Sequence, residues 1–212
     1  MGQIAFYATA FFASVCGGIG ILWYAKATND PQNKPNLTII ILWFMLAILM
    51  TLTYKNILGY DRPGNDLSDN KTLNDSWIKI TPSIVALIGN GYILWYLIRN
   101  RNYIFLKWDI LILILGIAIS ITLFLLMKFK DFHLLLQGIN TISYFPLILR
   151  IAQGKGKEPL GPWVIMSLGT EFAILTVLHN YKDFWDVMQP TRALICQALV
   201  IVFIVYKKKK AA

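Results

Sequence analysis

Residues 161–181 read GPWVIMSLGTEFAILTVLHNY, residues 184–206 read FWDVMQPTRALICQALVIVFIVY, and this apolar hairpin decides the fold. Each half has the roughly 20 mostly apolar residues that a helix needs to cross a bilayer. Each half also carries a charge deep inside it. Glu171 lies ten residues before the turn at 181–182, and Arg192 lies ten residues after it. At ~1.5 Å per helical residue, both charges are expected ~15 Å from the turn.

Two charges at matching depth are unusual, because an ionisable side chain near a bilayer centre costs about 2.5 to 3.5 kcal/mol. They predict one of two arrangements. Glu171 and Arg192 either form a charged binding site or form a buried ion pair that fixes one helix against the other. We favour the binding site, since the apolar runs hold more polar residues than one ion pair needs.

The rest of the chain repeats this pattern. The 212 residues are 57% hydrophobic, and the apolar residues gather in runs of about 20 rather than in amphipathic windows. Ahead of the two runs at 162–181 and 184–206 stand five more, at 4–25, 36–54, 78–98, 108–128 and 132–151. Because lipid offers no hydrogen bonds to the backbone, we predict an all-α polytopic membrane protein with seven transmembrane helices.

The basic residues predict the orientation of the chain in a membrane. When successive connections are placed on alternate sides, 12 Lys and Arg residues fall on one side and 7 on the other. The positive-inside rule then puts the amino terminus outside or in a lumen, and the lysine tail 207–210 in the cytosol. The membrane is a plasma or inner membrane, or that of the endoplasmic reticulum or Golgi in a eukaryote. Since the charges flank helix ends, the expected partner is the lipid bilayer and not nucleic acid.

A polar stripe marks the run 132–151. Gln137, Asn140, Thr141 and Tyr144 recur at i, i+3, i+4 and i+7, which places them on one helix face. Such a face lies against protein or water when the helix is in a membrane. Other apolar runs hold further polar side chains, and Ser167 shares a helix face with Glu171. The predicted binding residues are Glu171, Arg192, Asn90, Trp43, Gln137, Asn140, Tyr144 and Ser167.

Two of the apolar runs contain residues that can bend a helix. Pro146 should kink the helix that contains it. In the first run, closely spaced glycines allow either close helix packing or a bend. The predicted hinge residues are Pro146, Gly17, Gly18 and Gly20. Neither a cofactor nor a metal site is predicted.

The order of the runs indicates an internal repeat. Residues 78–98 align with 184–206 at an offset of 108, which sets Pro82 on Pro190, and 36–54 aligns with 162–181 at an offset of 126. The long polar loop at 55–77 accounts for the difference of 18. Two copies of three helices in the same orientation need one extra crossing, and the nearly featureless run 108–128 supplies it. We therefore predict two parallel three-helix bundles, residues 1–103 and 131–212, joined by a linker helix in residues 104–130.

This layout resembles the SWEET, semiSWEET and PQ-loop superfamily, whose helices are arranged as three, one and three. The stretch Thr141-Ile142-Ser143-Tyr144-Phe145-Pro146 is similar to the one that leads into that superfamily's proline hinge, with Leu147 where glutamine usually follows. Sugar-carrying relatives use an asparagine in each third helix and a tryptophan in each second helix. Asn90 and Trp43 match these positions in the first bundle. The resemblance implies transport by two bundles that close around a midplane site.

The sequence therefore predicts a transporter that moves a small polar or charged solute by alternating access. The alternative is a receptor or sorting protein on a similar scaffold, as KDEL receptors are, and the terminal Lys209-Lys210-Ala211-Ala212 resembles a dilysine retrieval signal. An intramembrane enzyme is not expected, because the sequence has no His-Glu-x-x-His and no Gly-x-Ser-x-Gly. Whether the chain forms a homo-oligomer is left open.

Overall fold

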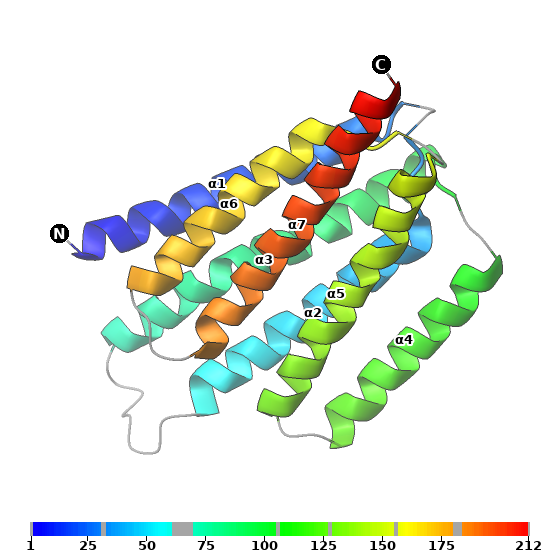
Figure 1. Cartoon of the computed structure of the whole chain (residues 1–212). Coiled ribbons are helices and arrows are strands. Elements are labelled where there is room, and N and C mark those ends of the chain that lie inside the picture. The colour runs from blue at the N-terminus through cyan, green and yellow to red at the C-terminus, as the bar shows by residue number, and fades with distance from the viewer. Residues whose placement is uncertain are drawn as a thin grey trace.

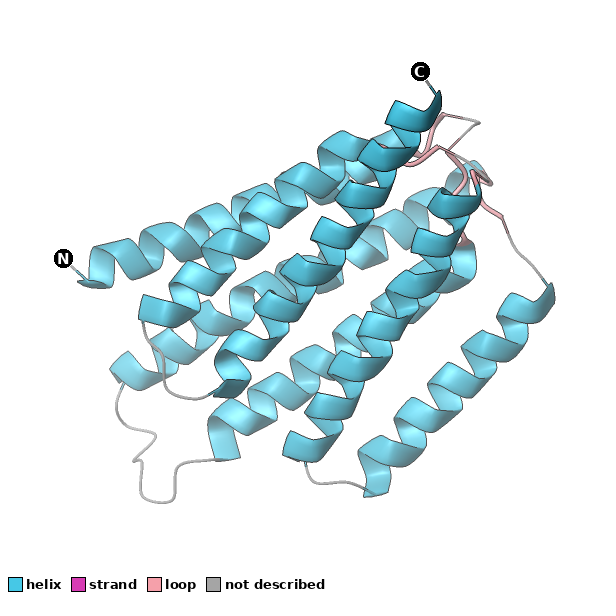
Figure 2. Cartoon of the chain, viewed as in Figure 1, coloured by secondary structure: helices cyan, strands magenta, loops and turns pink. Residues whose placement is uncertain are grey.

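The apolar runs form helices throughout the part of the chain that the structure describes. This computed structural model describes residues 2–30, 33–60, 70–104, 107–126, 129–154, 157–179 and 184–211. Within these ranges there are seven helices: α1 (Gly2–Ala27), α2 (Leu37–Tyr60), α3 (Asn70–Asn100), α4 (Lys107–Leu126), α5 (Phe129–Gln153), α6 (Leu160–His179) and α7 (Phe184–Ala211). The prediction of an all-helical chain with seven helices is confirmed (Figures 1 and 2).

The helices have the apolar surface that suits a bilayer. Among the described residues, four stretches are long and apolar enough to cross a membrane: Gln3–Ala27, Leu134–Gln153, Leu160–His179 and Val187–Lys210. A shorter apolar helical stretch covers Leu37–Leu52. Large apolar side chains also point away from the protein, and Ile4, Leu125 and Ile142 are each more than two-thirds exposed. An outward apolar surface of this kind is typical of a membrane protein.

Six of the helices form a closed ring. Neighbours in contact run in the order α1, α3, α2, α5, α7, α6 and back to α1. The seventh helix, α4, packs only on α2 and α5 within the described part, and it stands at the margin of the bundle in Figure 1. Its lack of polar atoms fits this peripheral position. The two chain ends lie at opposite ends of the bundle (Figure 1).

Three connections meet at one end of the bundle, which we call the loop end (described residues 28–30, 33–36, 101–104, 154 and 157–159; Figure 2). The N–H of Leu37 donates to the carbonyl of Ile104 at 3.1 Å, and the N–H of Ile104 donates to the carbonyl of Pro35 at 3.0 Å. Tyr96 on α3 adds a hydrogen bond to Asn29 at 2.7 Å. α5 ends at Gly154, whose φ of 70° is one that glycine adopts without strain.

The helices extend further than the sequence predicts at the opposite end. We expected a loop over residues 55–77, but α2 continues to Tyr60 and α3 begins at Asn70. The reason is that the polar residues of this segment fit helix termini, where backbone groups can be solvated. Of the expected loop, only 61–69 lies outside the described residues.

Glycine is used for close packing between α1 and α6. A Cβ at Gly169 would lie 2.9 Å from the backbone nitrogen of Gly17 and 3.0 Å from the carbonyl oxygen of Ala13. A Cβ at Gly20 would also meet the backbone of α6, whereas one at Gly18 would meet nothing within 4 Å. The two backbones therefore approach as closely as small residues allow. α1 runs unbroken through these glycines, and α5 runs unbroken through Pro146.

Candidate functional site

The ring encloses a cavity of about 230 Å³. Side chains from α1, α2, α3, α5, α6 and α7 line it, and none of the described residues of α4 does. On α6 the lining positions include Met166, Gly169, Thr170 and Ala173, which have the i, i+3, i+4, i+7 spacing of one helix face, and the lining extends to Trp163, Thr176 and Val177. The cavity volume is below the 300 to 1,000 Å³ or so of typical drug-sized sites, so the space suits a small solute.

Four aromatic rings form the wall of the cavity that lies toward the loop end. Tyr24 is near the end of α1, Trp43 near the start of α2, and Trp163 near the start of α6. The ring centroids of Trp43 and Tyr144 are 5.0 Å apart, and those of Tyr24 and Trp163 are 5.9 Å apart. Trp163 also contacts both Trp43 and Tyr144, with centroids 6.3 Å apart in each case. The four rings therefore pack as one cluster.

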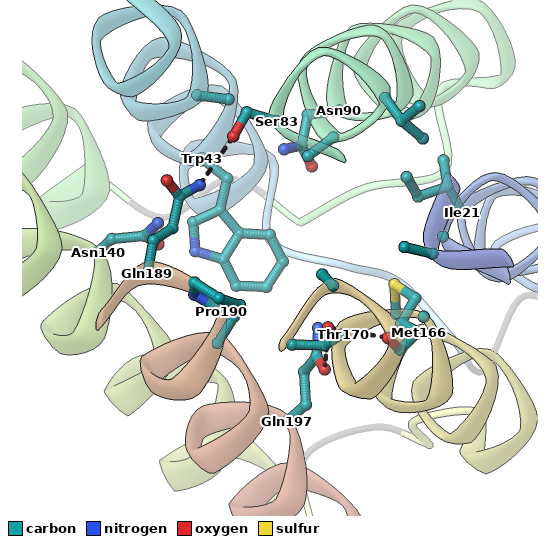
Figure 3. Close-up of a pocket in the computed structure, with 18 of the residues that line it drawn as sticks. Ile21, Trp43, Ser83, Asn90, Asn140, Met166, Thr170, Gln189, Pro190 and Gln197 are labelled. Carbon is teal, nitrogen blue, oxygen red and sulfur yellow. Dashed lines mark hydrogen bonds between the residues drawn. The ribbon is translucent and has the colours of Figure 1, made fainter. Parts of the chain in front are cut away.

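Hydrogen bonds fix the orientation of this wall. Trp43 Nε1 donates to Ser143 Oγ at 2.6 Å, and Ser143 Oγ donates to the carbonyl of Asn140 at 2.6 Å. Asn140 Nδ2 in turn lies 3.3 Å from Met50 Sδ. These contacts join α2 to α5 and hold the indole of Trp43 toward the middle of the cavity (Figure 3). The residues Thr141 to Pro146 thus supply both the bond to Trp43 and the ring of Tyr144.

Two further hydrogen bonds join side chains of the cavity lining (Figure 3). Thr170 Oγ1 donates to Gln197 Oε1 at 3.0 Å, which joins α6 to α7. Gln189 Nε2 donates to Ser83 Oγ at 3.0 Å. The second bond links α7 to α3, two helices that are not neighbours in the ring. It therefore crosses the cavity instead of running along its wall.

Arg192 is the charged residue among the described residues that line the cavity. Its Nε donates to Gln137 Oε1 at 2.5 Å, and Gln137 is 3% exposed. Its Nη1 is buried without a hydrogen-bond partner in the described part of the chain. The guanidinium is therefore oriented from one side by an amide and left under-satisfied on another.

The structure brings most of the predicted binding residues together. Trp43, Asn90, Asn140, Tyr144 and Arg192 line the cavity. Gln137 does not line it, but holds Arg192 from behind. Ser167 is buried away from the cavity, and its Oγ has no partner among the described residues.

The predicted pairing of Glu171 with Arg192 is wrong. Glu171 is exposed on the outside of α6, does not line the cavity and forms no ion pair with Arg192. The two residues do share a depth along their helices, as the sequence indicates. However, Glu171 follows Thr170 by about 100° around α6, and Thr170 is the one that faces the cavity.

Sequence reasoning missed a buried cluster around the carboxylate of Glu158 at the loop end. Arg150 Nη2 donates to Glu158 Oε2 at 2.7 Å, and the Glu158 side chain is 1% exposed. Trp163 Nε1 donates to Glu158 Oε1 at 3.1 Å, and the Tyr24 hydroxyl also bonds this carboxylate. Arg150 Nη1 reaches the carbonyl of Lys34 at 2.5 Å. We call Tyr24, Lys34, Arg150, Glu158 and Trp163 the loop-end cluster; it ties α1, α5 and α6 to the α1–α2 connection.

Burial sets the electrostatics of Glu158. It raises the pKa of this carboxyl above the usual value, and the positive charge of Arg150 and the hydrogen bonds from Trp163, Tyr24 and Arg150 oppose that rise only in part. In the sequence, Glu158 stands among lysines in the segment Lys155-Gly156-Lys157-Glu158, which is typical of a solvated loop. Nothing local shows that the helix ends fold over it.

The geometry is that of a small, mostly apolar cavity with a few oriented polar groups and one guanidinium among its described lining residues. The chain has no significant match among known protein families, curated proteins or solved structures.

Proposed function

We propose that this chain is a membrane transporter that moves a small polar or charged solute by alternating access. The observation that carries the proposal is the cavity itself, a space of about 230 Å³ within a ring of six helices. Four helices contribute a side chain able to hydrogen-bond a solute: Asn90, Asn140, Thr170 and Gln197. Its volume favours a small solute over the peptide that a sorting receptor would bind.

In this proposal two three-helix bundles move against each other. The first comprises residues 1–103, the second comprises 131–212, and the helix in 104–130 links them in parallel. The ring order supports this division. When α1, α2 and α3 are exchanged with α5, α6 and α7, the order α1, α3, α2, α5, α7, α6 maps onto itself. That is the behaviour expected of a repeat about an axis along the membrane normal, as in SWEET-like transporters.

The contacts at the two ends of the cavity support alternating access. At the loop end, the loop-end cluster and the aromatic rings tie the two bundles together. Toward the opposite end, one hydrogen bond among the described residues, from Gln189 to Ser83, crosses the cavity. Within the described part of the chain, the polar and aromatic contacts at the loop end are therefore the more extensive. We infer that the loop end is the closed gate here, and that Pro146, Gly17, Gly18 and Gly20 adjust when the closures exchange.

The orientation in the membrane follows from charge. The loop end carries the larger share of basic residues, and the tail 207–210 lies on the same side. We therefore place the loop end and the carboxyl terminus in the cytosol, and the amino terminus outside or in a lumen. The closed gate is then the cytosolic one.

The experiment is counterflow in liposomes that contain the purified protein. Vesicles preloaded with an unlabelled small solute should accumulate the labelled solute transiently, and the initial rate should saturate with concentration. The probes are small sugars, amino acids and small carboxylates. A receptor would bind a probe without flux. Asn90→Ala should reduce the rate about fivefold, the loss of one solute hydrogen bond of ordinary strength. Leu115→Ala on the outer surface of α4 is the control that should retain it.

A cross-link tests the movement directly. In a background with Cys16 and Cys196 replaced by alanine, the double variant Ser83→Cys with Gln189→Cys places two thiols where one hydrogen bond now spans the cavity. A short bifunctional thiol reagent should stop counterflow, and a cleavable form of the reagent should restore it on reduction. Each single cysteine variant should keep its flux after the same treatment. Undiminished flux in the cross-linked protein would exclude alternating access between α3 and α7.

A further inference from the structure

We propose that the solute carries a carboxylate and that Arg192 binds it. This inference rests on the proposed function, because it names the class of solute for the same cavity. Arg192 forms part of the cavity wall, and its side chain is partly accessible there. It brings a full positive charge to a space whose other described lining residues are neutral.

Among the described residues, no carboxylate compensates this charge. The Nε of Arg192 bonds an amide oxygen of Gln137, which is neutral, and the thiol of Cys196 lies within electrostatic reach of the guanidinium. Of the described glutamates, Glu158 pairs with Arg150 and Glu171 is exposed, so neither contacts Arg192. A guanidinium in this setting is costly without a negative partner, and an anionic solute supplies one.

The planar shape of the Arg192 guanidinium favours a carboxylate as its ligand. Gln137 holds the Nε edge, so the terminal nitrogens remain for a ligand, and Nη1 has no acceptor among the described residues. The planar fork of arginine matches the two oxygens of a carboxylate. A phosphate dianion usually gathers more than one cation or a cluster of backbone N–H groups. Of these the described cavity lining has only the one guanidinium.

The other lining residues indicate what the uncharged part of the solute should be like. Tyr144 is within electrostatic reach of Arg192, and its ring packs on Trp43 at 5.0 Å between centroids. Aromatic faces favour a flat or apolar body beside the charged end. Thr170, Gln197 and Asn140 offer neutral hydrogen bonds to a hydroxyl or carbonyl group. A small organic carboxylate with a short or flat body fits these groups.

The test compares acid and amide pairs of almost equal size on the wild-type protein. Benzoate with benzamide, and lactate with lactamide, differ chiefly in charge. Binding is measured by calorimetry or thermal shift in detergent, with no need for flux. We expect at least one carboxylate to bind about tenfold or more tightly than its amide, the preference that one charge-assisted hydrogen bond provides.

Three variants test whether Arg192 causes the preference for the acid over the amide. Arg192→Gln should bring the acid-to-amide affinity ratio close to one, and Arg192→Lys should retain part of it, because an ammonium keeps the charge and loses the fork. Arg99→Gln is the matched control. Arg99 is exposed over the ring of Trp95, so this variant removes one positive charge away from the cavity and should keep the full ratio.

Two results would overturn the proposal: amides that bind as well as their acids in the wild type, or an undiminished ratio in Arg192→Gln. The first is read on the unaltered protein, so an unstable variant does not prevent a decision. Failure of the proposed function is a separate result. Carboxylate binding without counterflow would support the Arg192 site and contradict the transporter function. Counterflow of neutral solutes alone would support the transporter function and contradict the Arg192 site.

Discussion

Glu158 shows how strongly one residue depends on its surroundings. Its side chain is almost wholly buried, and that burial raises its pKa despite the contact with Arg150. A carboxyl with a raised pKa binds its proton more tightly in the folded protein than in the unfolded chain. The stabilisation from that proton is present below the usual glutamate pKa of about 4.3, and it is lost as the pH rises through the raised value.

Glu158→Gln should therefore remove a pH dependence of stability. In the wild type, the free energy of unfolding should fall as the pH rises from about 4 through the raised pKa of Glu158. The variant, whose side chain cannot ionise, should fall less over the same range. Thermal unfolding in detergent across this range measures both.

The control for this prediction is Asp30→Asn. It removes a carboxylate that is exposed in the connection at the loop end, outside the apolar spans, so it should leave the wild-type dependence unchanged. An identical slope for the wild type and Glu158→Gln would show that another group causes the dependence.

At the scale of elements, the contact between α1 and α6 depends on the absence of a side chain. Gly169 lies where a Cβ would meet two backbone atoms of α1, and backbone cannot move aside as a flexible side chain can. This contact crosses the boundary between the two proposed bundles. It therefore fixes how closely the bundles approach along one seam.

Gly169→Ala should lower the free energy of unfolding by about 1 to 3 kcal/mol, the usual cost of an added methyl in a filled contact. Denaturant unfolding of the purified protein in detergent gives this value. Gly18→Ala is the matched control, because a Cβ there meets nothing within 4 Å. It should be as stable as the wild type or more stable by up to about 1 kcal/mol, because alanine is the better helix former. A Gly169→Ala protein as stable as the wild type would mean that α1 and α6 can separate enough at this contact to fit the added methyl group.

At the scale of the whole molecule, the charge difference between the two ends predicts the orientation. The loop end and the tail 207–210 carry most of the basic residues, and such residues are retained on the cytosolic side. The predicted ends are accessible to chemistry, since Gln3 and Lys209 are both exposed.

Single cysteines at these positions should react from opposite sides. In a background with Cys16 and Cys196 replaced by alanine, Gln3→Cys should react with a membrane-impermeant maleimide added outside sealed right-side-out vesicles. Lys209→Cys should react only after the vesicles are opened. The reverse pattern would invert the proposed topology and place the closed gate outside.

Much of the fold could be predicted from the sequence, because helix formation in apolar runs is local. The seven helices follow from run length and from the need to satisfy backbone hydrogen bonds. The stripe in 132–151 likewise predicted that Asn140 and Tyr144 face inward, and both line the cavity. The predicted pairing of Glu171 with Arg192 was wrong, because the sequence indicates how deep Glu171 lies along its helix but not in which direction its side chain points.

The sequence by itself determined which segments are helical, how deep each polar residue lies, and that Arg192 stands far from either helix end. These properties depend on rise per residue and on composition. Only the tertiary structure decided that Arg192 faces a cavity with Gln137 behind it, that Glu171 faces outward, and that Glu158 is buried. The direction of a side chain around its helix, and the covering of a loop residue, depend on which other helices pack there, and neighbouring residues in sequence do not carry that information.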